Sequence, residues 1–196
     1  MKDVYGVGNA IVDVIAEVDD EFLSEVSLEK GHMTLIDNEQ MATIENKLSS
    51  APKKIMSGGS AANTIYAVQA FGGSTAYACR LSDDSNGQHF FRDFSESGIS
   101  ISNLSPAKEG ATAQCLVLVT PDAERTMATN LGVSANLTNS CIDQKVLSES
   151  KMVYLEGYLA TSEKNTSVAL KAREIALEAG AEVALTLSDA SILNPF

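Results

Sequence analysis

The sequence of 196 residues is poor in the side chains that build metal sites and disulfide frameworks. It contains no tryptophan, two histidines and three cysteines. The cysteines, Cys79, Cys115 and Cys141, are odd in number, far apart and without a Cys-x-x-Cys pair, so we expect buried, reduced thiols rather than disulfides or a zinc site. His32 and His89 are too scattered to indicate a metal site, and no metal ligand is assigned.

Basic residues are scarce as well. The 14 Lys and Arg residues stand against 26 Asp and Glu residues, which gives a formal charge of −12 without any basic cluster. A nucleic-acid backbone or an anionic membrane is therefore not an expected partner. No apolar run approaches the roughly 20 residues of a membrane span, and the N-terminus lacks the basic region of a signal peptide. These absences predict a cytoplasmic protein.

Apolar residues are plentiful: 44% of the sequence is hydrophobic, which is enough for the core of one domain. The stretch "VYGVGNAIVDVIAEV" predicts a buried strand followed by a second extended segment. Continuous apolar strands then alternate with amphipathic helices, which is typical of an α/β fold with a parallel sheet covered by helices. Helices are predicted over 38–48, 87–98, 141–147 and 162–180, and strands over 74–81, 112–120, 125–130, 151–160 and 182–187.

Two of these segments allow predictions about individual side chains and turns. In the helix over 87–98, Phe90, Phe91 and Phe94 are expected to face a core. The turn-forming cluster from Pro121 to Glu124 predicts a hairpin that joins the two strands beside it.

Two glycine patterns bear on nucleotide binding, and neither supports it. A P-loop needs Gly-Lys-Ser or Gly-Lys-Thr, and this sequence has neither. The pair Gly6-x-Gly8 begins like a dinucleotide fingerprint, but Ile11 occupies the third glycine position, where it would prevent close packing of helix and strand. An NAD-dependent oxidoreductase is therefore only a third hypothesis.

A third glycine pattern, "SGGSAANTIYAVQAFGG", favours an uncharged ligand. Gly58 and Gly59 would let a ligand approach the backbone closely, and Asn63 one turn into the following helix offers both donor and acceptor groups. With no cation beside them, these groups suit hydroxyls better than phosphates. Asp13 interrupts an apolar strand, where a carboxylate is costly to bury unless a partner such as a polyol satisfies it. The alternative is a plain turn with Asn63 on the surface.

Four segments in order, "GNAIVDVIAEVDDEFL", "SGGSAANTIYAVQAFGG", "RLSDDSNG" and "ERTMATNLGVSANLT", resemble the ribokinase-like (PfkB) carbohydrate and nucleoside kinases, in particular their adenosine-kinase-like branch. The resemblance covers essentially the whole chain. It implies a doubly wound, mostly parallel sheet with helices on both faces, and a small β lid from roughly 14–37 and 110–130. It also implies transfer of the ATP γ-phosphate to a primary hydroxyl, with ATP and Mg²⁺ as cofactors of the complete enzyme.

The resemblance also assigns site residues. Five positions match those that hold the sugar hydroxyls: Asn9, Asp13, Gly58, Gly59 and Asn63. Arg125 matches an arginine that reaches toward the phosphates. The apolar lid and wall over a base or sugar would be Met33, Leu35, Met127 and Tyr158. Simpler roles stay open for several of these: lid core for Leu35 and Met127, a solvated hairpin residue for Arg125, and a packing aromatic for Tyr158.

The sequence also departs from the family pattern. Ser82 replaces a common glycine before the Asp-Asp pair, and Ile65 stands where sugar kinases often have a small residue, whereas adenosine kinases also have isoleucine there. The Asp-Thr-x-Gly-Ala-Gly-Asp motif, which supplies the catalytic base and an anion hole of backbone amides, is absent, as is the Asn-x-x-Glu motif that organises magnesium. No catalytic residue is therefore assigned, and we expect this chain alone to be inactive and to bind ATP and Mg²⁺ only weakly.

The expected protein is thus the N-terminal, substrate-binding portion of a sugar or nucleoside kinase, without the C-terminal nucleotide-binding part. Its expected partner is a small sugar or nucleoside, whose identity the sequence leaves open. The strand "EVALTL" is apolar at four of its six positions, so self-association through the exposed sheet flank or the lid is also expected. The alternative from another class is a non-catalytic ligand-binding or interaction module derived from the same family.

Overall fold

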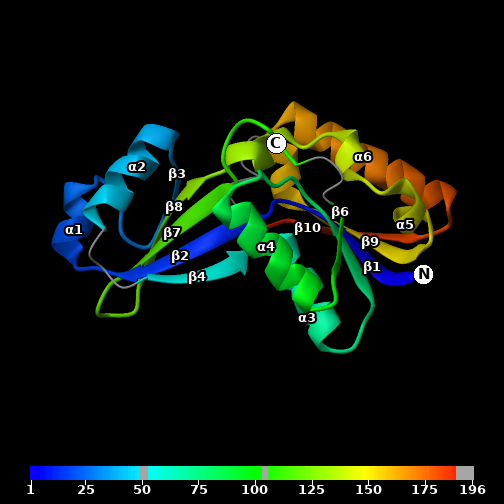
Figure 1. Ribbon diagram of the computed structural model, residues 1–196, viewed down its shortest axis with the longest axis horizontal. Helices are drawn as coiled ribbons and strands as arrows, with labels where there is room; N and C mark the ends of the chain where they lie inside the picture. The colour runs from blue at the N-terminus through cyan, green and yellow to red at the C-terminus, as the bar shows by residue number, and fades with distance from the viewer. Residues whose placement is uncertain (49–52, 103–105, 189–196) are drawn as a thin grey trace.

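A computed structural model describes residues 1–48, 53–102 and 106–188 and arranges their strands in two five-stranded sheets (Figure 1). The main sheet has the order β10-β9-β1-β5-β6, and all its pairings are parallel. The predicted parallel α/β sheet is therefore confirmed. Its strands are β1 (Lys2–Val7), β5 (Thr75–Ala78), β6 (Ser100–Ser102), β9 (Ser150–Glu156) and β10 (Glu182–Thr186).

Helices cover both faces of the main sheet. On one face, α3 (Ser60–Ala70) and α4 (Ser85–Glu96) share a buried cluster with Tyr77 of β5. On the other face, α5 (Gln144–Ser148) and α6 (Glu163–Glu178) share a second cluster with β1 and β9. The inner strand β5 thus buries both sets of its alternating side chains, whereas Leu185 of the edge strand β10 is 61% exposed.

The prediction for the aromatic face of α4 is right for two residues and wrong for one. Phe90 and Phe94 are buried, with their ring centroids 4.3 Å apart. Phe91 is 47% exposed. Residues four positions apart share one side of a helix, whereas the residue after Phe90 points about 100° away from it.

The second sheet has the order β3-β8-β7-β2-β4 and lies at one end of the molecule (Figure 1). It contains the predicted hairpin, because β7 and β8 pair antiparallel across the turn that holds Pro121 to Glu124. The two segments expected to form a lid, 14–37 and 110–130, both contribute strands to this sheet. β4 is the fifth strand, and the helix that precedes β4 packs on the sheet. The strands are β2 (Ile11–Glu17), β3 (Met33–Leu35), β4 (Lys53–Gly58), β7 (Ala113–Val119) and β8 (Arg125–Asn130).

Two helices cover one face of this second sheet. They are α1 (Asp20–Glu25) and α2 (Asn38–Lys47), and their apolar side chains form a third cluster with β2, β7 and β8. Asp37 caps α2 through its side chain, which accepts a hydrogen bond from the Gln40 amide at 2.8 Å. The Asp37 amide in turn donates a hydrogen bond to Gln40 Oε1 at 3.2 Å, so the start of this helix is well defined.

The remaining elements are three short 3₁₀ helices, η1 (Gly132–Asn136), η2 (Asn139–Cys141) and η3 (Gly157–Thr161). The helix predicted over 141–147 divides into the end of η2 and the start of α5. All three cysteines are buried and free, as expected. In the described ranges, no helix is both long enough and apolar enough to cross a membrane.

Candidate functional site

The described chain crosses between the two sheets four times, and the candidate site lies at the first two crossings. β1 leads into β2 through Gly8, Asn9 and Ala10, and β4 leads directly into α3 through Gly58 and Gly59. This connectivity rules out the dinucleotide fingerprint. A fingerprint needs a helix after its glycines, but here a strand of the second sheet follows.

Asp13 lies in β2, between Met56 of β4 and Cys115 of β7. Its neighbours Val12 and Val14 are buried in hydrophobic clusters on the other side of the strand. The Asp13 side chain is half-buried, and this burial raises the pKa of its carboxyl to about 6. No described residue donates a hydrogen bond to it or pairs with its charge. The carboxylate is therefore available to accept donors from a ligand.

The two glycines at the end of β4 are required by close approaches. A Cβ on Gly58 would lie 2.3 Å from Asp13 Oδ2. Gly59 has a φ of +112°, and a Cβ there would lie 2.4 Å from the backbone oxygen of Asn9. Any side chain would force these segments apart. The glycines thus bring the first turn of α3 against both Asp13 and Asn9.

Asn9 is 3% exposed and is held by a buried carboxylate, Glu156, at the end of β9. Its Nδ2 donates to Glu156 Oε1 at 2.9 Å, and the Ala61 amide donates to Glu156 Oε2 at 3.0 Å. Tyr77 donates its hydroxyl to the Asn9 backbone oxygen at 2.9 Å. Burial raises the pKa of Glu156 to about 7. Asn9 Oδ1 is buried and has no partner among the described residues.

Glu156 is not among the site residues predicted from the sequence, although the sequence marks it as unusual. Glu156 is the single carboxylate in "KMVYLEGYLA", the same kind of polar interruption that pointed to Asp13. Its two hydrogen bonds connect the end of β9 to Asn9, which follows β1, and to Ala61 in α3, so Glu156 stabilises the junction.

Asn63 is exposed on α3 and lines a cavity of about 300 Å³ between β4, α3 and α4. Asp13 does not line this cavity, and no hydrogen bond within the described part of the chain joins the two side chains. Two buried atoms on residues that line the same cavity, Ser57 Oγ and His89 Nε2, also lack described partners. The other lining residues are Ile55, Met56, Tyr66, Asp93 and Phe94.

Most side chains around Asp13 on its face of the second sheet are apolar. Cross-strand neighbours point to the same face of a sheet, so the pairing gives two rows of side chains on this face. The first row runs through Leu35, Thr129, Cys115, Asp13 and Met56. The second row runs through Met33, Met127, Val117, Ile15 and Lys54. Met33, Leu35 and Met56 are 39%, 59% and 43% exposed, and Tyr158 in η3 is half-buried two residues after Glu156.

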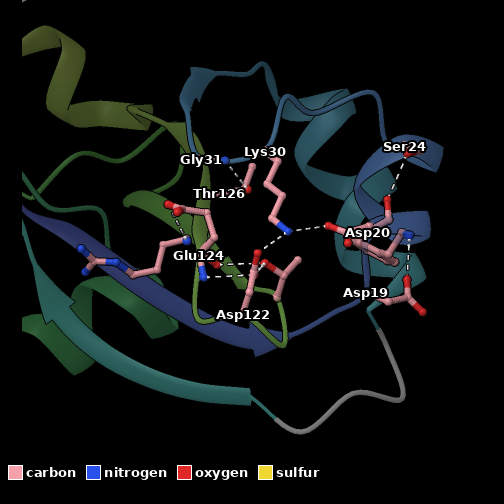
Figure 2. Close-up of polar contacts among 11 residues, drawn as sticks. Asp19, Asp20, Ser24, Lys30, Gly31, Asp122, Glu124 and Thr126 are labelled. Atoms are coloured by element: carbon pink, nitrogen blue, oxygen red, sulfur yellow. Dashed lines mark hydrogen bonds and ion pairs between the residues drawn. The ribbon is translucent and has the colours of Figure 1, made fainter.

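Arg125 is exposed at the start of β8, beside the hairpin turn. The turn is tied to α1 by Lys30, whose Nζ lies 2.8 Å from Asp20 Oδ1 and 2.8 Å from Asp122 Oδ2 (Figure 2). These pairs raise the pKa of Lys30 and lower that of Asp122. The hydrogen bond from the Gly31 amide to Thr126 Oγ1 at 3.0 Å adds a second tie. The strand that begins with Arg125 is therefore anchored at its free end.

The described residues include no group of three or more His, Cys, Asp or Glu side chains that could hold a metal ion. The junction carries two acceptors without a described partner, the Asp13 carboxylate and Asn9 Oδ1. The described residues thus form an α/β protein in which these acceptors lie where the two sheets meet.

The sequence matches the pfkB family carbohydrate kinases over residues 3–195, and the chain belongs to this family. It is 27% identical to the guanosine-inosine kinase of Escherichia coli strain K12 over 98% of this chain and 46% of that protein. The chain thus spans about half the length of the curated relatives it matches.

Solved structures of kinases are also similar to this chain over part of their length. The adenosine kinase from Sinorhizobium meliloti is 35% identical, with a TM-score of 0.88 over 100% of this chain and 59% of that one. A probable sugar kinase from Rhizobium etli CFN 42 is 34% identical, with a TM-score of 0.89 over 100% of this chain and 58% of that one. The expected family and α/β fold are therefore confirmed.

Proposed function

We propose that this chain is the acceptor-binding portion of an ATP-dependent nucleoside or sugar kinase that phosphorylates a primary hydroxyl. The observation that carries the proposal is the Asp13 carboxylate, half-buried beside Gly58 and without a described partner. A pair of ligand hydroxyls would satisfy it, and hydrogen bonds to a charged group are stronger than those between neutral groups.

The other groups at the junction have complementary roles in this proposal. Gly58 and Gly59 let β4 and α3 close on Asp13 and Asn9, and Asn63 would supply an amide from α3. Asn9 is oriented by Glu156, and its free Oδ1 would accept one further hydroxyl hydrogen. Because Asn9 is fixed before the ligand arrives, little ordering cost remains on binding.

The apolar rows beside Asp13 favour a nucleoside over a free sugar. A purine base has two flat apolar faces that could cover Leu35 and Met127, with Met33 and Tyr158 at the sides. A free sugar would reach Asp13 but leave Met33, Leu35 and Met56 in water. The names of the relatives, guanosine-inosine kinase and adenosine kinase, agree with this choice.

The reaction assigned to the complete enzyme has three tasks. The acceptor oxygen must be aligned with the γ-phosphorus, its proton must pass to a base as the bond to ADP breaks, and the charge on the phosphoryl oxygens must be stabilised. The residues described above serve the first task. Arg125 is the candidate for the third, as a cation at the start of β8. Bound ATP would supply the phosphoryl group.

Ligand binding tests the proposal without requiring turnover. The chain is titrated with adenosine, guanosine, inosine, ribose, fructose and ketodeoxygluconate, and its melting temperature is followed. A ligand at 100 times its dissociation constant stabilises the folded state by about 2.7 kcal/mol. We expect a nucleoside to give the largest shift.

The matched variants are Asp13→Asn and Glu17→Gln. Glu17 lies on the same strand and face as Asp13 but is exposed at the strand end. We expect calorimetry to show at least a tenfold loss of affinity for Asp13→Asn and no loss for Glu17→Gln, since one charge-assisted bond contributes about 1.5–3 kcal/mol. Equal affinities in both variants would remove Asp13 from the site, and no response to any ligand would contradict the proposed function.

A further inference from the structure

We infer that a second cavity, between the second sheet and the start of α6, binds a small oxyanion of the phosphate class through Arg80 and Lys164. The cavity has a volume of about 790 Å³. It is separate from the proposed acceptor site and independent of it. The residues that the argument uses are Asp37, Asn38, Arg80, Asn130, Asn136 and Lys164.

This cavity lies away from the Asp13 face. Asn130 follows Thr129 in β8, and successive side chains of a strand point to opposite faces. Thr129 shares its face with Asp13, so Asn130 points to the other side, where Asp37 and Asn38 begin α2. Asn130 Nδ2 donates to Asn38 Oδ1 at 2.9 Å and closes this edge of the cavity.

Two cations converge on one neutral residue at the opposite edge. Arg80 Nη1 donates to the backbone oxygen of Asn136, and Lys164 Nζ donates to Asn136 Oδ1 at 2.9 Å. Neither cation pairs with a carboxylate in the described part of the chain, whereas Lys30, Lys47, Lys151 and Lys171 all do. Two like charges held together repel each other, and an anion between them would reverse that repulsion.

The arrangement is rigid before any ligand binds. Asn165 is 2% exposed, its Oδ1 accepts from the Leu137 amide at 2.9 Å, and its Nδ2 donates to the Ser134 oxygen at 2.9 Å. These bonds fix the chain around Asn136, and with it the groups that hold both cations. A preorganised pair binds an anion without the cost of ordering long side chains.

The charges around the cavity favour an anion. Lys108 is a third cation on its wall, and Glu109 and Asp37 are the two carboxylates. Asp37 Oδ1 already accepts the capping bond from the Gln40 amide. In a chain with a net charge of −12, three cations at one cavity is a local reversal of sign. A phosphate group suits it because the planar guanidinium of arginine can donate two parallel bonds to its oxygens.

The phosphate group could come from free inorganic phosphate or from a phosphate ester, and the experiment distinguishes these two sources. Inorganic phosphate and glycerol 3-phosphate are titrated at constant ionic strength, with sodium chloride as the balance, and binding is followed by calorimetry and by melting temperature. We expect saturable binding by both the wild-type chain and Lys171→Gln, a control on the same helix whose lysine pairs with Glu174. Lys164→Gln and Arg80→Gln should each bind at least tenfold more weakly. Tighter binding of the ester than of inorganic phosphate would identify a phosphorylated metabolite, and equal binding would identify phosphate itself.

The same affinity in Lys164→Gln, Arg80→Gln and Lys171→Gln, or no saturable binding by the wild-type chain, would overturn the inference. The acceptor site provides the cross-check: Asp13→Asn should keep phosphate binding, and Lys164→Gln should keep the response to the nucleoside panel. Loss of phosphate binding in Asp13→Asn would show that the two sites are one, which also contradicts the inference.

Discussion

The two sheets of this protein differ in how their faces are covered. The central strands of the main sheet are covered by helices on both faces, and every residue of β5 is buried. The second sheet is covered by α1 and α2 on one face only, and its other face carries an unpaired carboxylate among partly exposed methionine and leucine side chains. Burial on both faces gives stability, whereas a face left open gives a surface on which a ligand can complete the packing.

The largest expected effect concerns chemistry. If the open face only positions an acceptor, the 196 residues alone should transfer no phosphate, because they lack the family motifs for the base and the anion hole. Each such group typically contributes several orders of magnitude to the rate. The chain is incubated with magnesium-ATP and the acceptor panel, and ADP release is measured. Acceptor-dependent release that Asp13→Asn abolishes would show that the binding face also performs the chemistry.

The next effect concerns stability. Phe94→Ala in the main core should lower the free energy of unfolding by about 3–5 kcal/mol, because it leaves a cavity beside Phe90 and Tyr77. Leu35→Ala on the open face should cost less than about 0.5 kcal/mol, since that side chain is 59% exposed. Both values are measured by urea denaturation without ligand. Similar losses would mean that the open face is as important for folding as the core.

A smaller effect depends on pH. Burial raises the pKa of Asp13 to about 6 and that of Glu156 to about 7, from ordinary values of 3.8 and 4.5. Both groups therefore hold protons more tightly in the folded state than in the unfolded state. Their contribution is complete below about pH 4 and is lost as the pH rises through 6 and 7.

We therefore expect the wild-type chain to lose stability between pH 5 and pH 8. Asp13→Asn, which cannot ionise, should lose on the order of 1 kcal/mol less over that interval. Urea denaturation at the two pH values measures the difference. Glu17→Gln is the control, and a variant at position 13 that follows the wild-type curve would show that the burial of Asp13 has no energetic consequence.

The smallest effect concerns the ion pairs that connect the β7–β8 hairpin turn to α1. Lys30→Met removes both ion pairs between α1 and the hairpin. Both pairs are exposed to solvent, which screens their attraction, so global stability should fall only slightly. Hydrogen exchange should accelerate at Thr120 to Arg125 and stay unchanged in β5. Lys151→Met, which removes a pair with Asp3 in the main sheet, should leave the hairpin as it was.

Much of the fold could be predicted from local patterns. The hairpin at Pro121, the cap of α2 and the parallel sheet all depend on neighbours in sequence or on strand composition. The exposure of Phe91 could not be predicted so simply, because all three phenylalanines of α4 lie within one and a half turns, and only the position of the sheet decides which side is buried.

The candidate site divides in the same way. The sequence by itself determined that Asp13 is an unusual residue, because a carboxylate in an apolar strand is conspicuous without any knowledge of its neighbours, and that Gly58 and Gly59 permit a close approach. Only the tertiary structure decided that Glu156 holds Asn9 across 147 positions of the chain, and that Arg80 and Lys164 meet at Asn136. Such contacts depend on strand order and helix packing, which bring distant segments together by burying apolar area and leave no trace in the local spacing of residues.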